Sequence, residues 1–102
     1  MTVSWAIEPA PPVAGSDTVA VITLQDDRKQ PVRGATLQLE GHMSHPGMAP
    51  VTSSVTDRGD GTYEGRLQFS MAGDWIVVVT GELPDGRRIT RQLEIAGIRP
   101  AD

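Results

Sequence analysis

Hydrophobic and polar residues alternate in short runs along most of this 102-residue chain, which is the period of β-strands with one buried face. No stretch of useful length shows the period of a helix, and turn-forming residues separate the runs. We expect strands at residues 3–8, 18–25, 35–40, 51–56, 62–70, 75–80 and 87–95. The pattern predicts an all-β fold: one domain over residues 1–102, built as a seven-stranded antiparallel immunoglobulin-like β-sandwich.

The predicted strands differ in their expected positions. Residues 75–80 are apolar on both faces, which is typical of a central strand. Residues 51–56 hold few apolar side chains, so we expect a weak edge strand there. On residues 62–70, alternate positions form an inward apolar face, and Met71 would continue that face.

The reversal of the chain at each strand predicts which loops meet. In an antiparallel sandwich, connections two strands apart in sequence open at the same end. Loops 9–17, 42–50 and 71–74 should therefore share one end, and loops 26–31, 58–61 and 83–86 the other. This parity brings Met71 to the loop that begins at His42.

That loop holds most of the candidate chemistry. Both histidines and two of the three internal methionines fall in His42-Met43-Ser44-His45-Pro46-Gly47-Met48, and the third internal methionine is Met71. Imidazole and thioether groups suit Cu(I). We predict one Cu(I) site from His42, Met43, His45, Met48 and Met71, with His45, Met48 and Met71 ranked first. The alternatives are a surface loop with solvated histidines and a Met71 that only fills the end of the core.

Composition argues against several other functions. The formal net charge is −4 without a basic cluster, so nucleic acid is not an expected partner. The longest apolar runs are too short to span a bilayer. The absence of cysteine removes disulfides, thiolate zinc sites and cysteine nucleophiles. Ser44 and His45 are adjacent, but no acid is placed to orient the histidine, so we do not expect an enzyme.

Four segments, in order and spacing, resemble the YtkA-like domain family, which includes FixH-like proteins. They are Asp26…Gln30-Pro31-Val32…Gly34-Ala35, Met43-Ser44-His45-Pro46-Gly47-Met48, Gly59-Asp60-Gly61-Thr62-Tyr63 and Met71-Ala72-Gly73-Asp74-Trp75. The resemblance runs from Pro11 to Glu94. It implies a periplasmic or other extracytoplasmic copper-handling sandwich, free or membrane-anchored, with the histidine-methionine loop and Met71 as ligands. It also implies a copper-acceptor protein or membrane complex as partner.

Two further considerations shape the functional hypothesis. The chain is also similar to the CopC class of periplasmic copper carriers, but those use an amino-terminal histidine for Cu(II), and this chain begins Met1-Thr2-Val3. Its start shows no secretory leader, so we expect either a cytoplasmic protein or a segment whose signal or anchor has been removed. The expected function is a Cu(I) carrier or chaperone. The alternative is an immunoglobulin-like interaction module of a membrane-associated complex, without metal.

Overall fold

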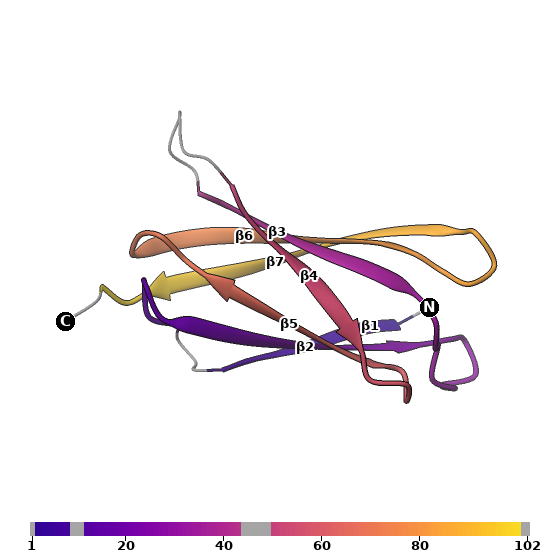
Figure 1. The fold of residues 1–102 in the computed structure, drawn as a ribbon. Coiled ribbons are helices and arrows are strands. Elements are labelled where there is room, and N and C mark those ends of the chain that lie inside the picture. The colour runs from indigo at the N-terminus through magenta and orange to yellow at the C-terminus, as the bar shows by residue number, and fades with distance from the viewer. Residues whose placement is uncertain (1, 9–11, 44–49, 101–102) are drawn as a thin grey trace.

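The computed structural model describes residues 2–8, 12–43 and 50–100, and all seven predicted strands form within them (Figure 1). They are β1 (Thr2–Glu8), β2 (Asp17–Gln25), β3 (Thr36–Met43), β4 (Val51–Asp57), β5 (Thr62–Gln68), β6 (Gly73–Glu82) and β7 (Arg88–Ile98). No helix occurs in these ranges, so none is long and apolar enough to cross a membrane. The predicted all-β class is confirmed.

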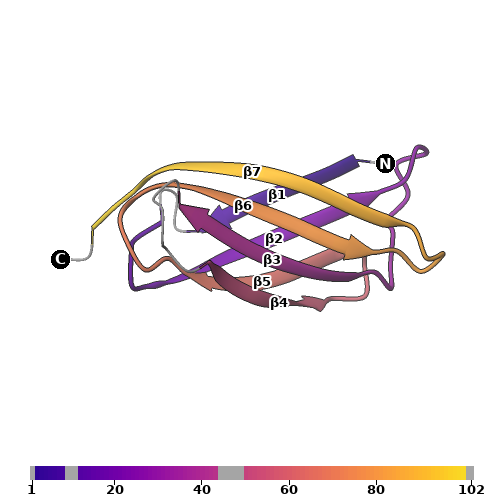
Figure 2. The ribbon, with the colours of Figure 1, turned by 90° about the horizontal axis from the view of Figure 1, so that it is seen from above.

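The strands are hydrogen-bonded in the order β1-β2-β5-β4-β3-β6-β7, and every paired strand runs antiparallel to its neighbours. This continuous sheet folds over on itself into two layers. One layer is formed by β1, β2 and β5, and the other by β3, β6 and β7. Figure 2 shows β1 and β7 along one side of the molecule and β4 along the other.

Strand β4 joins the two layers, so the prediction of an edge strand at residues 51–56 was wrong. Its first half, Val51–Ser54, pairs with β3. Its second half, Val55–Asp57, pairs with β5. Only alternate residues of β4 are even half-buried, because the strand follows the bend between the layers. This shallow burial explains its polar, edge-like sequence.

The core lies between the layers and is built from the inward-facing residues of the strands. Strand β6 is central in its layer, as predicted, because β3 and β7 flank it. Its inward residues Trp75, Val77 and Val79 are each 2% exposed. The outward Ile76 is 37% exposed, so only one face of β6 is fully buried.

The loop residues that the structure describes gather at the two ends that strand reversal predicts (Figure 1). At one end, the Gly15 amide donates to the Phe69 carbonyl at 2.8 Å, which joins the β1–β2 loop to the end of β5. At the other end, the Leu24 amide donates to the Gly61 carbonyl at 3.0 Å, and the Gly34 amide donates to Asp57 Oδ2 at 3.1 Å.

Candidate functional site

Strand β3 extends further than predicted, and this changes the position of two candidate ligands. His42 and Met43 are its last two residues and pair with Ile76 and Trp75 of β6; they do not belong to the loop. Successive side chains of a strand point to opposite faces of the sheet. Met43 therefore lies on the inward side, packed against the core, whereas His42 lies on the outward side.

The outward position of His42 gives it a different partner. Its Nε2 lies 2.6 Å from Oε1 of Glu40, two residues earlier on the same face of β3, and its side chain is 44% exposed. The Glu40 carboxylate thus engages the imidazole away from Met43. The sequence carries the signal for this pair, since the i, i+2 spacing places both residues on one face once the strand is known to include residue 42.

Met71 lies in the turn between β5 and β6, and it does not fill the core. Strand β5 ends at Gln68, three residues before Met71. The Met71 side chain is 47% exposed, while Phe69 is fully buried. The alternative of Met71 as a core residue was therefore wrong.

Trp75 connects the turn that holds Met71 to the end of β3. Its Nε1 donates a hydrogen bond to the Met71 carbonyl oxygen at 2.9 Å. On the neighbouring strand, Trp75 is in register with Met43. Met43 and Met71 therefore lie at the same end of the sandwich, as strand parity predicts. The other two leading candidates, His45 and Met48, lie outside the described residues.

The other metal-ligating groups give no competing site within residues 2–8, 12–43 and 50–100. In these ranges, no three histidine, cysteine, aspartate or glutamate side chains are grouped closely enough to hold a metal ion. Zinc, calcium and magnesium sites are built mostly from such groups. The candidate ligands at the described end are instead thioethers, which favour Cu(I).

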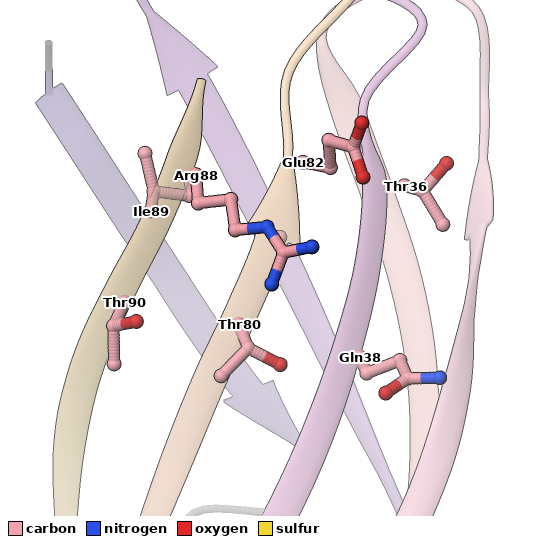
Figure 3. A pocket seen from close by; sticks show the side chains of 8 residues that line it. Thr36, Gln38, Thr80, Glu82, Arg88, Ile89 and Thr90 are labelled. Carbon is pink, nitrogen blue, oxygen red and sulfur yellow. The ribbon is translucent and has the colours of Figure 1, made fainter. Parts of the chain in front are cut away.

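A groove of about 390 Å³ lies at the opposite end of the outward face of β3, β6 and β7 (Figure 3). Its lining residues are Thr36, Gln38, Thr80, Gly81, Glu82, Arg88, Ile89 and Thr90. They include neither imidazole nor thioether groups. This groove is therefore separate from the methionine end, both in position and in chemistry.

Comparison with solved structures supports the sandwich-type fold. The crystal structure of the Lin-41 filamin domain aligns with a TM-score of 0.65 and 18% identity, covering 95% of this chain and 91% of that one. MtrC from Shewanella baltica OS185 aligns with a TM-score of 0.55 and 12% identity, covering 99% of this chain but 23% of MtrC. At these identities the likeness concerns the fold alone.

Sequence comparison identifies the family. No curated protein matches the chain closely enough to serve as a relative. The profile of the YtkA-like family, in contrast, matches residues 2–80. The match begins with β1 and continues into β6, so it includes the strands and turns that carry Met43, Met71 and Trp75. This chain is a member of the YtkA-like family.

Proposed function

We propose that this domain is an extracytoplasmic Cu(I) carrier that holds one ion at the methionine end of the sandwich. The observation that carries the proposal is that Trp75 pairs with Met43 across β3 and β6 and hydrogen-bonds the backbone carbonyl of Met71, so that both methionines lie at one end of the sandwich. Two thioethers from different elements at one rim suit a soft ion. Met71 is exposed, so a partner's ligands could replace it without opening the core.

The proposed ligands are His45, Met48 and Met71, with Met43 completing the set. Met43 is favoured over His42 because His42 faces outward toward Glu40. Thioethers bind the ion without releasing a proton, so transfer to an acceptor requires only ligand exchange. The role proposed is carriage to a copper-acceptor protein or membrane complex, and not catalysis.

The test is an anaerobic Cu(I) titration against a competing chelator. We expect one ion per chain. A Met48→Leu/Met71→Leu double variant should lose more than about tenfold in Cu(I) affinity, because mutation of a residue that only orients a metal ligand already costs about tenfold or more. Leucine preserves apolar volume and removes sulfur. Ile76→Leu is the matched control, because it changes the other exposed large apolar side chain of the described residues at this end.

Repeating the titration at several pH values gives a second measurement, the pH dependence of the Cu(I) affinity. Imidazole has a reference pKa of about 6.5, and a proton competes with the metal for it. The Cu(I) affinity should therefore fall below about pH 6 if His45 is a ligand, and a pH-independent affinity would remove His45 from the set. An unchanged affinity in the double variant would contradict the copper proposal. The metal-free interaction module would then be the better account.

A further inference from the structure

Trp75 occupies a position between the two described thioether residues. Its side chain is 2% exposed, and its ring stacks edge-on against Phe69 with ring centroids 5.1 Å apart. A buried indole N–H needs an acceptor. The acceptor here is the Met71 carbonyl oxygen, at 2.9 Å. The indole is therefore fixed by the core on one side and holds the β5–β6 turn on the other.

The turn also passes close to Met43. Gly73 has a φ of +129°, which L side chains rarely adopt. A Cβ built on Gly73 would lie 3.2 Å from the terminal methyl carbon Cε of Met43. The β6–β7 register also shifts between Gly73 and Trp75. A glycine at this point thus lets the segment that follows Met71 approach the Met43 thioether.

We infer that Trp75 is a positioning residue that sets Met71 relative to Met43 for binding of a soft monovalent ion. Trp75 pairs with Met43 in the β3–β6 register, and its N–H fixes the backbone of Met71. Trp75 need not touch the ion. The inference rests on the proposed function and adds to it the residue that preorganises two of its ligands.

The experiment uses Ag(I) as an air-stable probe and compares two variants of similar position. Trp75→Phe removes the N–H that holds Met71 and keeps an aromatic ring in the core. Val77→Ala is the control, because Val77 is equally buried two residues along the same face of β6 and does not hold the turn. We expect Trp75→Phe to lose about 10- to 100-fold in Ag(I) affinity, and Val77→Ala to retain the wild-type affinity.

A second measurement separates positioning from simple loss of stability. In the metal-free protein with ¹³C-labelled methionine methyls, Trp75→Phe should shift the resonances of Met71 and Met43, while Val77→Ala should leave Met71 in place. A Trp5→Phe background leaves Trp75 as the sole tryptophan. Its emission should change saturably at one equivalent of Ag(I).

The outcomes distinguish this inference from the proposed function. Wild-type affinity in a folded Trp75→Phe chain would overturn the positioning role and leave the copper proposal standing. Failure of the wild-type chain to bind Ag(I) would overturn both. If Trp75→Phe does not fold, the Trp5→Phe chain decides: unchanged Trp75 emission at saturating Ag(I) would place the ion elsewhere and overturn the inference.

Discussion

Thr18 is the buried polar residue whose replacement should stabilise the domain. It lies on β2 opposite Leu67, near the end of the sandwich that holds Met71. It is 0% exposed, and its Oγ1 has no hydrogen-bond partner among residues 2–8, 12–43 and 50–100. A buried hydroxyl left unpaired costs about 1–3 kcal/mol, because the unfolded chain hydrates it. Thr18→Val removes that hydroxyl while keeping the β-branched shape that suits a strand.

The expected gain can be estimated from these terms. Removing the penalty is worth about 1–3 kcal/mol, and the new methyl adds less than about 1 kcal/mol of hydrophobic burial. Thr18→Val should therefore raise the free energy of unfolding by at least about 1 kcal/mol, and the midpoint of thermal unfolding by roughly 4–8 °C for a domain near this size. Urea denaturation followed by circular dichroism measures the change.

A matched variant identifies which group is responsible. Thr18→Ser keeps the hydroxyl and removes the methyl, so it should lower the free energy of unfolding by about 1 kcal/mol or more. The reasoning is refuted if Thr18→Val fails to raise that free energy, and most clearly if it lowers it by about 1 kcal/mol or more, on the scale of a lost hydrogen bond. Such a loss would mean that the hydroxyl has a partner in solution, such as a buried water.

The other predictions concern the opposite end of the sandwich. The hydroxyl of the fully buried Tyr63 accepts from the Ala35 amide at 3.1 Å and donates to the Val32 carbonyl at 2.8 Å. Tyr63→Phe should therefore lower the free energy of unfolding, measured by urea denaturation, by about 1–3 kcal/mol. A change near zero would contradict a structural role for these bonds. Burial raises the pKa of Tyr63, so the wild type, but not Tyr63→Phe, should lose stability to this group as pH rises above about 10. Hydrogen bonds from the side chain and amide of Thr62 lower the pKa of Asp60. The resulting stabilisation is complete above the unfolded value near pH 4 and is lost as pH falls through the lower folded value. Asp60→Asn should therefore flatten the acid limb of a stability–pH curve, and an unchanged limb would show that the carboxylate contributes nothing.

Alternating burial made the strands predictable, because each inward position must be apolar for the layers to pack. The position of β4 was not predictable in this way. Its partly buried residues Val51, Ser53 and Val55 alternate like those of an edge strand. A strand that divides its length between two layers covers little core, so its side chains give no sign that both its edges are paired.

For the candidate site, the sequence predicted which elements lie at the same end of the sandwich. Strand parity placed Met71 at the end where β3 finishes, and that required only a correct strand count. The last residues of β3 were harder, because Gly41 interrupts the apolar positions of the strand just before His42 and Met43. The hydrogen bond from Trp75 to Met71 depends on the path of the turn, which the identities of the residues do not specify.

The division of β4 between the layers has a consequence for how the chain folds. Its two halves need partners from both layers, β3 on one side and β5 on the other. Strand β5 is completed in turn by β2, across the long separation between Asp17 and Gln68. Such non-local closure slows folding. Strand β4 itself pairs with the strands directly before and after it in sequence. Those local pairings can form early, and the two layers should close late, when β2 pairs with β5.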